Sequence, residues 1–143
     1  MNRPSYKTLE RASDLAVRVS GKTQAEVLSN SAFALFDLMT DLEKVEAKES
    51  IALEVEGVDD ELIANWIREL LYLFQTGGYV LKEVDVKETK GSSVRAEGKG
   101  EKFDPDRHDI RREFSSVLAH QCRMGKTGEQ WTAQVTFELE GGS

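Results

Sequence analysis

Residues 59–78, which read DDELIANWIRELLYLFQTGG, constrain the fold of this chain more than any other stretch. Their apolar side chains recur at the three- and four-residue spacing of one wide helical face. These side chains are Leu62, Ile63, Trp66, Ile67, Leu70, Leu71 and Phe74. Asp59 or Asp60 can cap the first turn, and Gly77-Gly78 supplies the left-handed conformation in which helices commonly end. Because so wide an apolar face has to pack against a sheet or another helix, the stretch predicts the core helix of a single domain.

The flanking segments predict a second helix and several strands. Thr23 and Glu26 form a capping box, and the apolar stripe behind it predicts a helix to about Thr40. Residues 6–10 are ambiguous, while alternating apolar and polar residues predict strands elsewhere. The predicted strands cover residues 15–19, 51–56, 79–88, 94–100, 114–122 and 131–139, with a turn over 125–128.

The order of these elements indicates an α+β fold. Consecutive strands after the second helix favour two main helices on one face of a mixed or mostly antiparallel sheet of about six strands. Two helices are too few for a doubly wound nucleotide-binding fold. We expect one domain over residues 1–143, with residues 1–5 and 140–143 frayed.

Composition narrows the functional classes. The net charge is −7, which disfavours a general phosphate-binding surface, so any action on RNA is expected to pass through a partner or a metal. A single cysteine, Cys122, excludes an internal disulfide framework. No apolar run approaches the ~18 residues of a spanning helix, and no signal-peptide core follows Met1. We therefore expect a cytoplasmic protein that does not enter a membrane.

Few residues outside the acidic ones favour chemistry. No nucleotide-binding loop, nucleophile elbow or zinc-protease motif is present. Gly98-Lys99-Gly100 is expected to end a hairpin more readily than to hold a phosphate. His108 is expected to be solvated in a charged loop, His120 to be partly buried at a strand end, and Cys122 to be a small buried hydrophobe.

Four acidic residues suggest a metal site. Asp37 and Asp41 are predicted in the last turn of the first helix, where the helix dipole disfavours negative charge. A divalent cation held by oxygen ligands would compensate for that charge. Asp14 precedes the first strand, and Glu138 could reach the same point if the last strand neighbours the first. A solvated acidic edge is the alternative.

Several stretches together resemble the archease family. They are Leu9–Asp14, Ala32–Asp41 with its Leu-Met-Thr-Asp ending, Trp66–Phe74, Gly100–His108 and Trp131–Glu138. The string GEKFDPDRH over residues 100–108 is the most specific of them. The stretches follow the family's order along nearly the whole chain.

The resemblance implies an accessory protein and not a free-standing enzyme. Archeases are partners of the RtcB-type RNA ligase, which joins 3′-phosphate or 2′,3′-cyclic phosphate ends to 5′-hydroxyl ends. The ligase is guanylylated on a histidine, using GTP and manganese. Archease promotes that step and sustains multiple turnover in tRNA splicing and RNA repair. RNA is therefore expected to be reached only through the ligase.

The resemblance also implies a small acidic metal site. Carried over by position, its ligands fall on Asp14, Asp41 and Glu138, with Arg11, Asp37 and His120 as accessory residues. Mg²⁺ or Ca²⁺ suits such a set of oxygen ligands, and Mn²⁺ is also compatible.

This sequence departs from the family pattern near that site. The usual E-H-T-A-D reads Glu10-Arg11-Ala12-Ser13-Asp14, and the usual final aspartate is Glu138. Ser115 stands in place of a lysine, and Leu118-Ala119-His120 in place of Thr-Tyr-His. Arg11 could replace the positive charge, or could pair with Asp14 and displace the metal. Two alternatives to a ligase activator therefore stay open: a metal-free binding or chaperone-like module, and a metal-dependent phosphoryl hydrolase.

Overall fold

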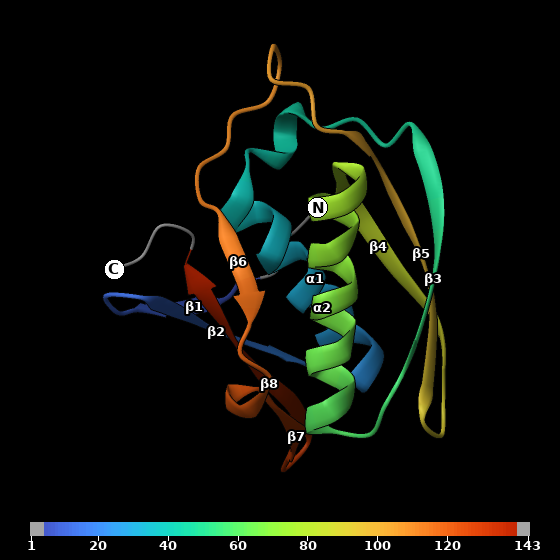
Figure 1. The fold of residues 1–143 in the computed structure, drawn as a ribbon. Coiled ribbons are helices and arrows are strands. Elements are labelled where there is room, and N and C mark those ends of the chain that lie inside the picture. The colour runs from blue at the N-terminus through green and yellow to red at the C-terminus, as the bar shows by residue number, and fades with distance from the viewer. Residues whose placement is uncertain (1–4, 140–143) are drawn as a thin grey trace.

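Two helices lie between two antiparallel sheets in this computed structural model, which describes residues 5–139 (Figure 1). Residues 1–4 and 140–143, which include nearly all of the expected frayed ends, lie outside the described residues. None of the described helices is long and apolar enough to span a membrane.

The first sheet has five strands and contains the first and the last strand of the described chain. Its strands are β1 (Lys7–Glu10), β2 (Asp14–Gly21), β6 (Phe114–Val117), β7 (Arg123–Thr127) and β8 (Gln130–Leu139). The order is β1-β2-β8-β6, and β7 pairs with β8 farther along the same edge as β6. The central pair, β2 and β8, matches residues 14–21 with residues 138–131.

The second sheet has three strands in the order β3-β5-β4. They are β3 (Glu49–Glu56), β4 (Tyr79–Lys90) and β5 (Ser93–Lys102). Helices α1 (Gln24–Met39) and α2 (Asp60–Gly77) each contact strands of both sheets. The 3-10 turns η1 (Leu42–Lys44) and η2 (Ala119–Gln121) complete the described elements.

The α+β class is confirmed, but the layering differs from our expectation. We predicted about six strands in one sheet with the helices on one face. The described chain instead has eight strands in two sheets, all pairs are antiparallel, and the helices fill the space between the sheets. The extra layer arises because the long β4–β5 hairpin pairs with β3, whereas β2 finds its partner at the other end of the chain.

The predicted strand over residues 114–122 is wrong in its second half. Strand β6 ends at Val117, and the turn η2 follows. The expected turn over residues 125–128 is also misplaced, because Gly125 lies within β7. The chain reverses at Gly128, whose φ of 64° is a left-handed conformation that favours glycine.

Helix α2 provides the core, as its sequence predicts. Trp66 is completely buried, and its indole N–H donates a hydrogen bond of 2.9 Å to the Leu28 carbonyl in α1. The other predicted core residues of α2 are buried too, except Phe74, which is partly buried. Gly78 ends the helix in the left-handed conformation. Asp59 occupies the N-cap position but makes no capping bond with its side chain.

The predicted N-cap of α1, Thr23, is confirmed. Thr23 Oγ1 accepts a hydrogen bond of 3.1 Å from the Glu26 backbone N–H. The Glu26 carboxylate in turn accepts one of 3.2 Å from the Lys22 N–H. The first contact satisfies a backbone donor that the first turn of the helix leaves without a partner, whereas the second reaches the residue before the N-cap and not the N-cap N–H of a complete capping box.

The expected role of Gly98-Lys99-Gly100 as a hairpin end is wrong, because these residues lie inside β5. A Cβ at Gly100 would stand 1.9 Å from the Val80 carbonyl oxygen, and one at Gly98 would stand 2.6 Å from a Leu81 methyl carbon. Close packing on the β4 backbone therefore requires glycine at position 100, whereas at position 98 a side chain could be accommodated only if Leu81 moved.

A buried carboxylate explains the string at residues 100–108. Glu101 is 4% exposed, and it pairs with the Arg107 guanidinium. Its Oε2 accepts a hydrogen bond of 2.6 Å from the Glu46 N–H. The His108 ring, 1% exposed, places Nε2 3.2 Å from the same oxygen. We call Glu101, Arg107 and His108 the Glu101 cluster.

The expectation that His108 is solvated is therefore wrong. Its Nδ1 accepts a hydrogen bond of 2.8 Å from the Asp104 N–H, which leaves the hydrogen on Nε2. From that cluster the loop runs over the end of α1, where Thr40 Oγ1 donates to the Asp109 carbonyl and the Arg111 N–H donates to the Met39 carbonyl. The cluster therefore fixes a loop that continues to the end of the first sheet.

Replacing Trp66 by leucine should lower the free energy of unfolding by about 2–4 kcal/mol, because a cavity replaces the buried indole. Tyr72→Phe on the same helix is the matched control, since Tyr72 is 57% exposed and its variant should differ from the wild type by less than about 0.5 kcal/mol. Urea unfolding followed by circular dichroism measures both. Equal stability of the two variants would contradict the central place of Trp66 in the core.

Replacing Glu101 by glutamine should lower the free energy of unfolding at pH 7 by about 1–3 kcal/mol, because buried donors lose a charged acceptor. Glu97→Gln, in the same strand, should change it by less than about 0.5 kcal/mol. The Arg107 hydrogen bond lowers the pKa of Glu101 to about 2 against the opposing effect of burial.

This pKa shift also predicts a pH dependence. Because the folded-state pKa lies below the ordinary value of 4.5, the ionised Glu101 stabilises the fold fully above pH 4.5. That contribution is lost as the pH falls toward about 2. The stability difference between wild type and Glu101→Gln should therefore shrink across this range. A difference that stays constant down to pH 2 would show that the carboxylate charge is not what stabilises the cluster.

Candidate functional site at the acidic end of the first sheet

Two carboxylates meet where the central strands of the first sheet end. Asp14 opens β2, and it lies directly opposite Glu138 of β8 in the antiparallel register. Directly opposed residues present their side chains on the same face of a sheet. The Arg11 N–H donates to the Asp14 carbonyl, and the Leu139 N–H donates to the Ser13 carbonyl, so the backbone on both sides of the pair is held.

The two carboxylates differ in how their oxygens are satisfied. Glu138 Oε1 accepts hydrogen bonds from the hydroxyls of Ser115 and Ser116, at 3.1 and 3.2 Å. Asp14 Oδ1 is buried and has no hydrogen-bond partner among the described residues. A buried carboxylate oxygen without a partner is energetically unfavourable and marks a position where a cation or a donor could bind.

Arg11 is the cation nearest to Asp14. Its Nε lies 4.0 Å from Asp14 Oδ1, beyond hydrogen-bond distance, and its side chain is 60% exposed. Exposed pairs of this kind contribute little energy, so Arg11 supplies positive charge nearby without satisfying the oxygen.

Asp41 occupies a different position from the predicted one. Helix α1 ends at Met39, so Asp41 lies beyond its last turn and is the N-cap of η1. Asp41 Oδ1 accepts a hydrogen bond of 3.1 Å from the Glu43 N–H, and Arg111 Nη2 lies 3.7 Å from Oδ2. A carboxylate is favourable at an N-cap, so the argument from the dipole of the first helix does not apply to Asp41.

The accessory residues are dispersed around this end. Asp37 lies in the last turn of α1, as predicted, and accepts a hydrogen bond of 2.5 Å from the Tyr6 hydroxyl. His120 lies in η2, where it is exposed rather than partly buried, so that expectation is wrong. Between residues 5 and 139, no three histidine, cysteine, aspartate or glutamate side chains lie close enough together to hold a metal ion.

Two arginines at this site were missed in the sequence. Arg111 lies beside Asp41, and Arg112 Nη2 forms an ion pair of 3.0 Å with Glu10. Both belong to the loop that the Glu101 cluster fixes. The signal available was the run of charge after His108, but its position over the end of α1 depends on contacts across the fold.

Cys122 is buried, as expected. Burial raises the pKa of its thiol, and Sγ lies 3.5 Å from the Leu118 carbonyl oxygen. A protonated, buried thiol is a poor nucleophile, so Cys122 takes no part in the site.

Solved structures with the same fold come from two organisms. Protein 1598 of Methanobacterium thermoautotrophicum superposes with a TM-score of 0.76 at 26% identity, covering 94% of this chain and 98% of that one. An archease of Thermotoga maritima, described as a possible chaperone, superposes with a TM-score of 0.59 at 13% identity, covering 97% of this chain and 98% of that one. The second likeness concerns the fold alone.

Sequence comparisons give the family. The chain is 35% identical to the protein archease of Methanopyrus kandleri over 94% of its own length and 99% of that protein. It is 34% identical to the protein archease of Pyrococcus abyssi over 94% and 98% of the two lengths. The model of the Archease protein family (MTH1598/TM1083) matches residues 6–139. The chain therefore belongs to the archease family.

Proposed function

We propose that this protein is an accessory factor of an RtcB-type RNA ligase and promotes its guanylylation and multiple turnover in tRNA splicing and RNA repair. Membership of the archease family supports the proposal, and so does the acidic end of the first sheet. The protein itself performs no covalent step. Its substrate RNA is reached through the ligase.

The observation that carries the proposal is the unsatisfied buried oxygen of Asp14. Asp14, Glu138 and Asp41 offer only carboxylate oxygens, which are the ligands that Mg²⁺, Ca²⁺ and Mn²⁺ prefer. Asp14 and Glu138 already lie opposite one another, and Asp41 would join them from the segment after α1. A cation bound there would supply positive charge that orders the phosphates of GTP in the ligase.

The residues around the pair have positioning roles in this proposal. The Ser115 and Ser116 hydroxyls hold one oxygen of Glu138 and leave the other without a hydrogen bond from the described residues. Arg11 adds positive charge beside Asp14 that a phosphate group could also contact. Arg111 holds Asp41 near the end of α1.

A metal-free binding module is the second candidate. It is favoured by Arg11 and Arg111, because each already places a guanidinium near one of the carboxylates. In this alternative the arginines take the place of the cation, and the protein acts by binding its partner alone. Hydrolysis of phosphoesters has less support, because no hydrogen bond or ion pair among the described residues links His120 to the three carboxylates as a general base.

Loss of a carboxylate should abolish stimulation of the ligase. Asp14→Asn, Asp41→Asn and Glu138→Gln should each lower the rate of ligase guanylylation at limiting Mn²⁺ by about tenfold or more, because each removes a charged oxygen ligand. Asp41→Asn keeps an oxygen that can accept from the Glu43 N–H, so the turn η1 stays capped. The assay measures radiolabelled GMP on the ligase histidine.

Asp85→Asn in β4 is the control for this assay, because Asp85 is an exposed carboxylate of the second sheet. It should stimulate like the wild type. Stimulation by the wild type that survives all three site substitutions would favour the metal-free module. No stimulation by the wild type would contradict the ligase function itself.

Removing the cation beside Asp14 should strengthen metal binding. Arg11→Ala should lower the dissociation constant for Ca²⁺ or Mg²⁺ by about threefold to tenfold, because a positive charge 4.0 Å from the ligand oxygen is lost. Isothermal titration calorimetry measures the constant. Arg95→Ala, which changes the net charge equally on the second sheet, should leave it unchanged. The same affinity in all three proteins would mean that Asp14 is not a ligand.

A further inference from the structure

The outer face of the first sheet carries a row of cations across four strands. The register places Lys7 of β1 opposite Arg18 of β2, Arg18 opposite Gln134 of β8, and Gln134 opposite Arg123 of β7. All four side chains therefore point away from the helices, since directly opposed residues share a face. Lys7, Arg18 and Arg123 are exposed, and Arg18 donates a hydrogen bond of 2.9 Å to the Gln134 side chain. We call these four residues the cationic row.

Within residues 5–139, the cations of the row, Lys7, Arg18 and Arg123, form no ion pair. Among the described residues, Arg123 donates only to the backbone carbonyls of His120 and Cys122. Three exposed cations without an ion pair to a described residue are unexpected on one face of a chain with a net charge of −7 and 26 acidic residues.

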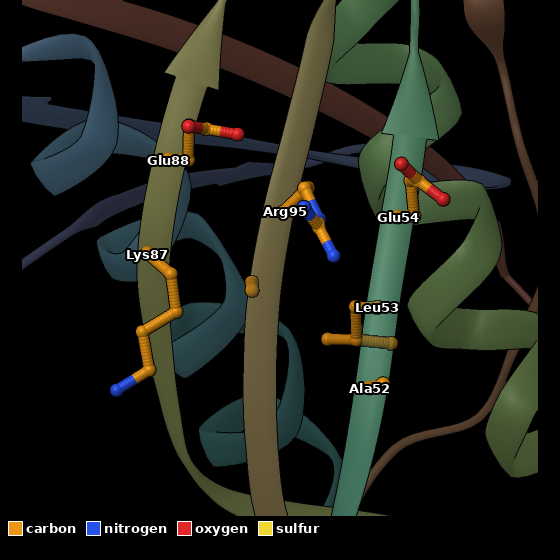
Figure 2. A pocket seen from close by; sticks show the side chains of 7 residues that line it. Ala52, Leu53, Glu54, Lys87, Glu88 and Arg95 are labelled. Atoms are coloured by element: carbon orange, nitrogen blue, oxygen red, sulfur yellow. The ribbon is translucent and has the colours of Figure 1, made fainter.

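The outer face of the second sheet has the opposite arrangement. There Arg95 of β5 lies between Glu54 of β3 and Glu88 of β4 in the register, and Figure 2 shows the three side chains on neighbouring strands. Lys87 and Lys99 each lie within 4.0 Å of a carboxylate. Cations on this second face are thus accompanied by acids, as on an ordinary solvated surface.

The cationic row lies on the same face as the acidic pair. Two residues along the strands from the row, on the same face, Leu9 and Ala16 lie opposite one another, and Leu9 is 58% exposed. Two residues farther along β2 and β8, the same face carries Asp14 and Glu138. The face therefore passes from the cationic row, through an exposed apolar side chain, to the proposed metal site within about 13 Å, the length of four extended residues.

We propose that this outer face is the docking surface for the ligase, and that the cationic row contacts an acidic surface of that protein; the inference rests on the proposed function. Docked in this way, the partner would cover Leu9 and face Asp14 and Glu138. Exposed arginine beside an exposed apolar side chain is typical of protein interfaces, in which opposite charges steer the two proteins together.

A protein partner fits this face better than an RNA strand does. Proteins that bind single strands combine cations with aromatic side chains on which bases stack. The outward positions of β1, β2 and β8 contain no aromatic residue, since Trp131 and Phe137 share the inward register with Gly21 and Leu15. An acidic protein surface requires only the cations and the apolar contact.

Two double variants with the same net charge test the proposal. Arg18→Gln/Arg123→Gln removes two charges from the cationic row, and Arg95→Gln/Lys99→Gln removes two from the outer face of the second sheet. Binding of each to the RtcB-type ligase of the same organism is measured by biolayer interferometry at two salt concentrations. The row variant should weaken binding by about tenfold, mainly through a slower, less salt-dependent association rate. The control variant should change it by less than about twofold.

Other outcomes overturn the proposal. Equal weakening by both variants would mean that total charge matters and not this face. If the wild type stimulates the ligase and the row variant binds it as tightly as the wild type does, the docking surface is refuted and the proposed function stays intact. If the wild type neither binds nor stimulates the ligase, both are refuted.

The same proteins test whether this face instead binds RNA or a second copy of the chain. If the row variant loses binding to a fluorescent single-stranded RNA but not to the ligase, the row is an RNA site. If the wild type is dimeric by sedimentation and the row variant is monomeric, the occupant is a second copy of the chain. Either result overturns docking of the ligase on this face.

Discussion

The antiparallel pairing of β2 with β8 is the constraint on which the rest of the structure depends. It joins the two ends of the described chain along residues 14–21 and 131–138, and both helices pack against its inward side chains. The same register sets Asp14 beside Glu138 and Arg18 beside Gln134 on the outward side. A slip of one residue would exchange the two faces, so the core and the proposed function depend on one alignment.

The Glu101 cluster shows how a family-specific string can serve structure instead of chemistry. Glu101, Arg107 and His108 come from the stretch that carries the family resemblance most specifically, and they contact one another, with Glu101 and His108 buried. Their ionic hydrogen bonds hold the loop that carries Arg111 to Asp41 and Arg112 to Glu10. The cluster thus acts on the acidic end indirectly, by fixing the path of the backbone.

The two sheets divide the outer surface by charge. On the second sheet Lys87 and Lys99 each have an acid within 4.0 Å, and Arg95 lies between two glutamates in the register; this arrangement suits contact with water. On the first sheet acids gather at one end and cations at the other. Unlike charges separated on one face create a directional field, which can orient a charged partner as it approaches.

Local sequence determined both helices and most of the strands, and only the tertiary structure decided the layers and the site. Periodicity and capping residues predicted both helices, because helical contacts join residues three and four positions apart. They could not predict that the helices lie between two sheets, since strand pairing joins distant residues whose match has no local signal. The same limit explains His108, whose burial depends on Glu101, and Asp41, which caps η1 because α1 ends at Met39, two residues before it. Asp14 and Glu138 were proposed from their positions in the sequence and from the family resemblance, but only the register of β2 and β8 brought them together.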